Sequence, residues 1–245
     1  MKDLRLGDKV LTANQKFESV YSFGHHDPSA RAHYVRIHTD VSEMPLEISA
    51  NHMIYRVEGG RRRALPASML RIGDILVTGN DEVENPKVVM VDGVVGDGAF
   101  APFTPSGTIV VNGLVASTFV AFSESHANDM GVSYQWIAHT FEGPHRWYCT
   151  LLDCSKESYH AGTGISNWVY GPWKLAHWMV SLKDGQGVLS PILFGVASVV
   201  MLCALGIFWV LDHGSWFAFA AIVAMLVKRL SIRVDIDKAK GAEAH

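Results

Sequence analysis

The sequence predicts an all-β domain made of two pseudo-symmetric halves, followed by an α-helical region associated with a membrane. Three observations predict this. An 11-residue phrase occurs twice, short apolar runs alternate with turn residues to about residue 122, and residues 187–211 carry no charge. We therefore expect four segments: a β-domain (1–122), a tryptophan-rich helical region (123–186), a transmembrane part (187–231) and a polar tail (232–245).

The repeated phrase reads LRLGDKVLTAN at residues 4–14 and LRIGDILVTGN at residues 70–80, with six of the eleven positions identical. In each copy a Gly-Asp pair precedes an apolar stretch, and glycine supplies the positive φ that a sharp turn needs. Each copy therefore predicts a turn that leads into a core strand. Two copies predict two β-subdomains related by a pseudo-twofold axis, and the alternative is convergence on a common turn.

The rest of the first 122 residues has the pattern of short β-strands. In HYVRIHT (33–39), for example, Val35 and Ile37 alternate with the polar Arg36 and His38. Glycine, asparagine, aspartate and proline separate the runs. The other expected strands are 17–23, 46–49, 62–65, 88–95 and 108–115.

Residues 124–186 have helical lengths instead, in VSYQWIAHTF, PHRWYCTLLDCS and PWKLAHWMVSL. Pro144 and Pro172 are expected in the first turns of helices, where a missing N–H costs nothing. The domain boundary is thus expected near Ser123. Cys149 and Cys154, five residues apart, either form a disulfide or pack as thiols.

The uncharged run at 187–211 would make a helix of about 37 Å, which crosses a hydrocarbon core of about 30 Å. Asp212 then predicts a turn at an interface, and a second, shorter apolar stretch follows. Two topologies are open: a membrane hairpin, or a single span with the β-domain lumenal and the tail of Lys228 and Arg229 cytoplasmic. A buried hairpin in a soluble protein is the alternative to both.

Bulk composition narrows the function. A net charge of −3 over 245 residues gives no sign of a nucleic-acid partner. Three cysteines are too few for a disulfide framework, and charged residues interrupt any signal peptide at the start of the chain. We expect no cofactor and no metal.

Several motifs together resemble a known family. Paired L-x-x-G-D-x-V-L phrases resemble the Hint domain shared by hedgehog autoprocessing domains and inteins. ISANHMIYRV (48–57) resembles the family's T-x-x-H block, and GAFAPFTPSGTIVVNGLVASTF (98–119) resembles a hedgehog segment with an A-P-x-T-x-x-G-T core. SESHANDMGVSYQWIAHTF (123–141) resembles the E-x-H and W-A-H elements that follow it. The resemblance to the hedgehog branch covers residues 1 to about 142.

This resemblance implies self-cleavage of a peptide bond. A cysteine at the first residue of the domain attacks the preceding carbonyl, and a sterol hydroxyl then displaces the thioester. The upstream segment of the precursor leaves as a sterol ester. The implied partners are a cholesterol-like sterol, a membrane and that upstream segment, and the implied location is the secretory pathway or the cell surface.

His52 and Ser49 occupy the His and Thr positions of the T-x-x-H block. An imidazole can deliver a proton to the leaving amide nitrogen near neutral pH. The Ser49 hydroxyl can orient the scissile peptide, as the usual threonine would. The alternative for His52 is an ordinary strand histidine.

His25 falls where animal hedgehogs carry the aspartate that is thought to activate the sterol hydroxyl, by an ungapped count from HTD (38–40). A histidine can act as the general base there, and Asp27 takes the role if the loop is shifted. The alternative is a polar loop without a catalytic part.

The chain departs from the family pattern at two further places. Thr118 replaces a common cysteine, and no cysteine precedes Cys149, so the nucleophile and its strand are absent. We expect a truncated chain that is inactive as it stands. The alternative is a non-catalytic membrane protein whose β-domain binds a partner. Intein splicing is disfavoured because no terminal His-Asn pair occurs near residues 118–123.

Overall fold

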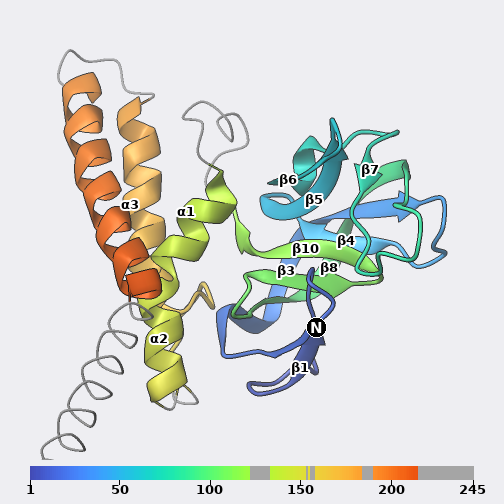
Figure 1. Cartoon of the computed structure of the whole chain (residues 1–245), viewed down its shortest axis with the longest axis horizontal. Coiled ribbons are helices and arrows are strands. Elements are labelled where there is room, and N and C mark those ends of the chain that lie inside the picture. The colour runs from blue at the N-terminus through green and yellow to red at the C-terminus, as the bar shows by residue number, and fades with distance from the viewer. Residues whose placement is uncertain (122–132, 153, 155–157, 184–189, 215–245) are drawn as a thin grey trace, which may run out of the picture.

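A computed structural model describes residues 1–121, 133–152, 154, 158–183 and 190–214. The strands gather into one body, and the helices form a second body beside it (Figure 1). β1 to β10 (9–120) precede α1 to α3 (134–183) in the chain, as the sequence predicts.

Three sheets make up the β-body in the described part of the chain. A two-stranded sheet pairs β1 (Lys9–Leu11) with β2 (Phe17–Ser19). A second has the order β4 (Leu46–Ser49), β3 (Ser22–Thr39), β8 (Val88–Phe103). The third has the order β6 (Arg61–Pro66), β5 (His52–Glu58), β10 (Leu114–Val120), β9 (Thr108–Val111), with β7 (Ile75–Leu76) paired to β5.

The two copies of the repeated phrase adopt the same turn, which confirms the pseudo-twofold arrangement. Gly7 and Gly73 have φ values of +87° and +97°. The N–H of Arg5 donates to the Asp8 carboxylate at 2.8 Å, and the N–H of Arg71 donates to the Asp74 carboxylate at 2.8 Å. Each glycine N–H then donates to a carbonyl 13 or 15 residues on, that of Val20 or Val88, at 2.8 Å.

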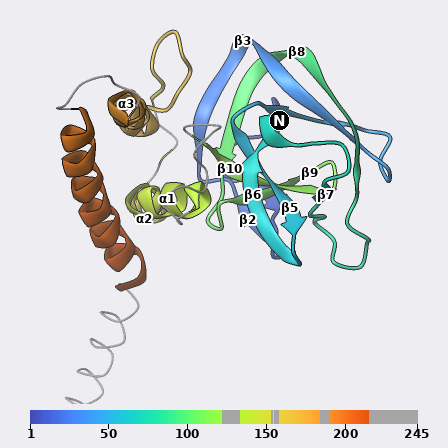
Figure 2. The same ribbon diagram turned by 90° about the horizontal axis from the view of Figure 1, so that it is seen from above.

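β3 and β8 are longer than the sequence predicts. They pair antiparallel from Ser22↔Phe103 to Thr39↔Val88, side by side along the body (Figure 2). The segment read as a polar loop, with His25 and Asp27, therefore lies in a strand. Because the register shifts between Asp27 and Arg31, the strand passes over its proline and serine without a break.

The main core fills the space between the sheets. It consists of buried aliphatic residues from β3 to β10: Ile37, Leu46, Ile48, Ile54, Leu65, Ala67, Leu70, Leu76, Val88, Ile109, Leu114 and Ala116. Alternation of buried and more exposed positions, such as the buried Ile37 beside the partly exposed Arg36, is what one covered sheet face requires. This core fixes the strands that carry the candidate site.

The described helices are α1 (Tyr134–Phe141), α2 (Gly143–Leu151), α3 (Asn167–Lys183) and an apolar helix (Ser190–Gly214). Ser133 caps α1 by accepting the Trp136 N–H. Pro144 lies in the first turn of α2, as expected. The expectation for Pro172 was wrong, because α3 begins at Asn167 and Pro172 lies inside it.

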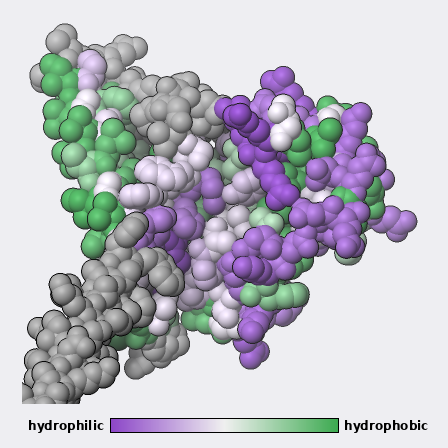
Figure 3. Space-filling view, viewed as in Figure 1, coloured by the Kyte–Doolittle hydropathy of each residue, from purple (hydrophilic) through white to green (hydrophobic). Residues whose placement is uncertain are grey.

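The apolar helix is the one described helix long and apolar enough to cross a membrane. Only 6% of its most apolar stretch is buried in the structure. Hydrophobic side chains cover its visible face, whereas the β-body is mostly hydrophilic (Figure 3). Its C-terminal end is attached to the other helices, since Arg146 of α2 contacts the Asp212 carboxylate at 2.7 Å. Both side chains are 12% exposed.

Some sequence expectations lie outside the described residues. These are the boundary at Ser123, the E-x-H element, the second apolar stretch, Lys228 and Arg229, and the polar tail.

Candidate active site

His52 begins β5, next to the end of β10, where it faces Val120 in the register. Its Nε2 lies 2.8 Å from the carbonyl oxygen of Ser117. A carbonyl only accepts, so Nε2 carries the hydrogen and Nδ1 is the nitrogen that exchanges protons. Burial lowers the pKa of His52, against the opposing effect of this carbonyl. The neutral imidazole therefore dominates near neutral pH, and its protonated form is a strong acid for a histidine.

Ser49 ends β4, three residues before His52, and pairs with Tyr34 of β3. The turn between them is fixed by the backbone: Asn51 accepts the Ala121 N–H at 2.7 Å, and Ala50 accepts the Ser68 N–H at 3.0 Å. Ser49 is partly buried. The spacing of the T-x-x-H block thus puts the serine and the histidine on either side of one tight connection.

Ser117, which sequence reasoning did not single out, organises this part of the site. It is fully buried, and its hydroxyl bonds the Phe119 N–H at 2.9 Å and the side-chain oxygen of Gln135. Gln135 of α1 also donates to the Gly107 carbonyl at 3.1 Å. The first helix therefore docks directly on the strand that holds His52.

His25 lies in β3, opposite Ala101 of β8. On its other side β3 pairs with residues 158–166, which we call the docking hairpin: His25 bridges to Ile165, and the His26 N–H donates to the Gly164 carbonyl at 2.8 Å. Burial lowers the pKa of His25, while Asp27 and the Thr163 backbone partly offset this. Its Nε2 is buried and makes no hydrogen bond within the described residues.

Asp27 has a local structural task. Its Oδ1 accepts the Ser29 N–H at 2.9 Å, the Ser29 hydroxyl at 2.7 Å and the Ala30 N–H at 3.1 Å. The Ser29 hydroxyl, together with these backbone groups, lowers the pKa of Asp27. An acid whose oxygen is engaged in this way is a weaker base than the neutral His25.

His52 and His25 lie near one aromatic cluster. Among the described residues, no hydrogen bond or ion pair joins the two side chains. Phe103 and Phe119 pack with ring centroids 5.4 Å apart, next to Met53. The Phe103 ring fills the space at Gly24, where an added Cβ would lie 2.3 Å from it. Met53 and Gly24, the chain neighbours of His52 and His25, thus contact the same aromatic cluster.

Thr118, at the position of the common family cysteine, is 1% exposed. Its hydroxyl makes no hydrogen bond within the described part of the chain, although its N–H donates to Gly107 at 3.0 Å. Thr118 thus keeps its place in β10 with its backbone hydrogen-bonded.

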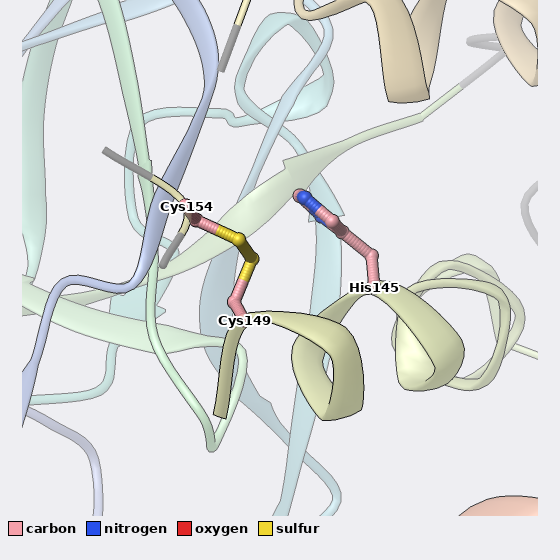
Figure 4. A group of neighbouring side chains, drawn as sticks. All are labelled: His145, Cys149 and Cys154. Carbon is pink, nitrogen blue, oxygen red and sulfur yellow. A yellow bond between two sulfur atoms is a disulfide. The ribbon is translucent and has the colours of Figure 1, made fainter. Parts of the chain in front are cut away.

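A second polar group lies where α2 meets the β-body. Glu142 accepts from the Tyr21 hydroxyl at 3.2 Å and contacts the His145 imidazole; both side chains are at least 95% buried. The ligand atoms of His145, Cys149 and Cys154 lie within 4.8 Å of one another, on one side of α2 (Figure 4). Cys149 and Cys154 form a disulfide, and because thiolates are the metal ligands, the pair is unavailable for a metal in this state.

Sequence reasoning missed Ser117, Gln135 and the docking hairpin. Ser117 belongs to the VAST segment (115–118), but it contacts His52 through its backbone carbonyl, which every residue type has. Gln135 lies on a helix that the sequence pattern predicts, but the pattern does not predict its contacts with Ser117 and Gly107. The hairpin had a weak signal, the Gly-Thr-Gly turn of residues 162–164.

Comparisons with known proteins place these features in a family. The chain is 32% identical to the Tiggy-winkle hedgehog protein of Danio rerio over 136 residues, 51% of this chain and 32% of the relative. It is 29% identical to the Sonic hedgehog protein of Xenopus laevis over 136 residues, 51% of this chain and 30% of the relative. The chain thus matches about a third of the length of these curated relatives.

Among solved structures, the fold is similar to the gp41-1 intein, with 14% identity, a TM-score of 0.37, and coverage of 47% of this chain and 83% of the intein. The VidaL intein gives 17% identity, a TM-score of 0.35, and coverage of 44% and 68%. The family model of the Hint module matches residues 1–181. The doubled Gly-Asp turn, the histidine at the start of β5 and this match together show that the chain belongs to the Hint family.

Proposed function

We propose that the chain is the processing unit of a hedgehog-type precursor, which cleaves the peptide bond ahead of it and transfers the upstream segment to a sterol. The observation that carries the proposal is the state of His52. It is neutral, its Nε2–H is held by the Ser117 carbonyl, and Nδ1 is left for proton transfer. An imidazole prepared in this way can accept the thiol proton at Nδ1 and then deliver it to the leaving amide nitrogen.

In the first step a cysteine thiol attacks the carbonyl that precedes it. The thiol proton passes to Nδ1 of His52, which delivers it to the amide nitrogen as the C–N bond breaks and the thioester forms. In the second step a sterol hydroxyl attacks the thioester, gives its proton to His25 and expels the thiolate. The product is an ester on the upstream segment. Ser49 orients the scissile peptide, and Asp27 holds the strand beside His25.

The nucleophile that this chemistry needs is not among residues 1–148. The test therefore uses a fusion in which a reporter, followed by a strand that begins with the nucleophilic cysteine, is placed ahead of Met1. Dithiothreitol cleaves a thioester without base assistance, so it reports the first step alone, and a sterol reports both. Wild-type fusion should release the reporter with either nucleophile. No release with dithiothreitol would contradict the proposed function.

His25→Ala and Asp27→Ala assign the base. We expect His25→Ala to keep thiol-induced release and to lose sterol-dependent release by about 10²–10⁴-fold, the usual contribution of a general base. Asp27→Ala is the matched control. The reverse pattern would assign the base to Asp27, and no effect from either would remove this strand from the chemistry.

We also propose that residues 1–122 form the processing domain, 123–186 the sterol-facing region and 187–231 the membrane part, in the secretory pathway. The support is the exposed apolar helix, four exposed tryptophans at positions 136, 147, 168 and 178, and a disulfide, which suits an oxidising compartment. The Arg146–Asp212 pair holds the C-terminal end of that helix beside the domain. In a single span that leaves the membrane surface at the domain, the N-terminal end of this helix, and not its C-terminal end, would lie beside the domain.

Liposome flotation tests this attachment. Val200→Lys and Ile207→Lys change side chains that are 64% and 60% exposed on the apolar helix, and we expect each to weaken binding. Phe17→Lys is the control, because Phe17 is 68% exposed on the β-body. Equal loss with all three variants would contradict a membrane role for this helix.

A further inference from the structure

The docking hairpin adds a short strand pair to the edge of β3 beside His25. Within the hairpin, Tyr159 bridges to Ser166, and the His160 N–H donates to the Ile165 carbonyl at 2.8 Å. Two hydrogen bonds join it to β3, from the His26 N–H to Gly164 at 2.8 Å and from the Ser166 N–H to Gly24 at 3.0 Å. The chain between α2 and α3 thus returns to the β-domain at the candidate base.

Gly164 lies against the imidazole itself. A Cβ added at Gly164 would lie 3.1 Å from His25 Nε2, 3.1 Å from His25 Cδ2 and 2.5 Å from the Asp27 Cβ. No side chain fits there unless His25 or the hairpin moves. The hairpin backbone therefore covers one side of the His25 ring at the buried Nε2.

We infer that the docking hairpin is the second wall of the alcohol-activating site, and that Gly164 is a positioning residue that sets the orientation of His25. This rests on the proposed function for its chemical meaning, but the contact itself can be tested without it. A general base must reach the hydroxyl proton at hydrogen-bond distance, so the orientation of the ring decides whether it acts.

The hairpin also joins this wall to the helices. The His160 ring stacks on Tyr170 of α3, with centroids 3.9 Å apart, and Tyr159 lies 5.6 Å from the His26 ring. The docking hairpin thus contacts α3 through His160 and contacts β3 beside His25. A sterol bound along α3 would reach the base on the side that the hairpin forms.

Two glycines of the same turn provide a matched pair of variants. Gly162 and Gly164 both have positive φ, +84° and +65°, so alanine strains the backbone at either position. A Cβ at Gly162 meets no atom within 4 Å, whereas one at Gly164 meets His25 and Asp27. The difference between Gly162→Ala and Gly164→Ala therefore reports the contact of the hairpin with His25 and Asp27.

The first readout is the titration of His25 in the full chain, followed by NMR of its imidazole. The groups that act on it are Asp27 and His26 on β3 and the Thr163 backbone of the hairpin; the facing β8 residue is alanine. Gly164→Ala should raise the His25 midpoint toward an ordinary histidine value, because the cover is displaced. Gly162→Ala should leave it unchanged. Equal midpoints in the two variants would overturn the inference.

The second readout is processing by the reporter fusion. Gly164→Ala should lower sterol-dependent release by about 10²-fold, the effect of a displacement of about 1 Å at a reacting group, with thiol-induced release retained. Gly162→Ala should stay within about twofold of wild type. If Gly164→Ala lowers both kinds of release equally, its effect is on folding and the positioning role is wrong. Absence of thiol-induced release in the wild type contradicts the proposed function instead, and leaves the titration to decide the contact.

Discussion

His52 makes two contributions that a pair of variants can separate. Its Nε2–H donates to the buried Ser117 carbonyl at 2.8 Å, and its Nδ1 is the nitrogen proposed to protonate the leaving amide. His52→Ala removes both. In His52→Gln the amide nitrogen lies about where Nε2 was, so the hydrogen bond to Ser117 is kept and only the titratable nitrogen is lost.

The magnitudes follow from the burial of Ser117, which is 0% exposed. A buried carbonyl left without a donor costs about 1–3 kcal/mol, so His52→Ala should unfold at lower urea with an unchanged m-value. His52→Gln should lose less than about 1 kcal/mol. In the reporter fusion, both variants should slow thiol-induced release by about 10²–10⁴-fold, because general acid catalysis is lost in both.

Urea titration of the full chain and thiol-induced release from the fusion measure the two effects independently. Release by His52→Gln at the wild-type rate would refute the role of Nδ1 as the acid. Equal destabilisation by the two variants would refute the hydrogen bond as the reason for the stability loss. Wild-type fusion treated in parallel gives the reference for both.

Three further predictions concern stability. Burial lowers the pKa of His52 below the ordinary 6.5, so the unfolded chain takes up the proton first as the pH falls. The stability that the neutral His52 contributes is therefore present above about pH 6.5 and is lost as the pH falls further. Urea midpoints measured at about pH 7.5 and 5.5 should differ less in His52→Gln than in the wild type. Gly24→Ala would press on the adjacent phenylalanine ring and should cost about 1–3 kcal/mol in urea unfolding, whereas Gly93→Ala, with no atom within 4 Å, should cost less than half of that. Replacement of Cys149 and Cys154 by serine should lower stability by about 2 kcal/mol, since the closed loop is short, and a reducing agent should then have no further effect.

The pseudo-symmetric frame was predictable because its signals are local. Gly7 and Gly73 are needed wherever a turn requires positive φ, and their neighbours Asp8 and Asp74 cap those turns. Alternation of apolar residues then gives strands such as β4 within a residue or two. The length of β3 could not be predicted, because its proline-containing middle is held in the sheet by pairing with β8, which lies more than 60 residues away.

The candidate site was predictable in its residue types and not in its contacts. His52 and His25 come from motifs, whereas the groups that prepare them are backbone atoms: the Ser117 carbonyl beside one and the Gly164 segment beside the other. A backbone atom has the same chemistry at every residue, so sequence carries no mark of it. The position of Pro172 was misjudged because α3 begins five residues earlier, at Asn167.

The duplicated phrase and the chemistry occupy different parts of the molecule. Both copies make the same turn with the same hydrogen bonds, and none of the candidate site residues lies in either copy. The helical region contacts the β-domain at segments outside the copies, through Gln135 to Gly107, Glu142 to Tyr21, and Gly164 to His26. Repetition therefore builds two matching turns, and the helical region contacts the β-domain at segments that differ from the repeated phrase. A reaction that needs a proton donor for one step and a proton acceptor for the next requires such a difference, because two identical halves would offer the same group twice.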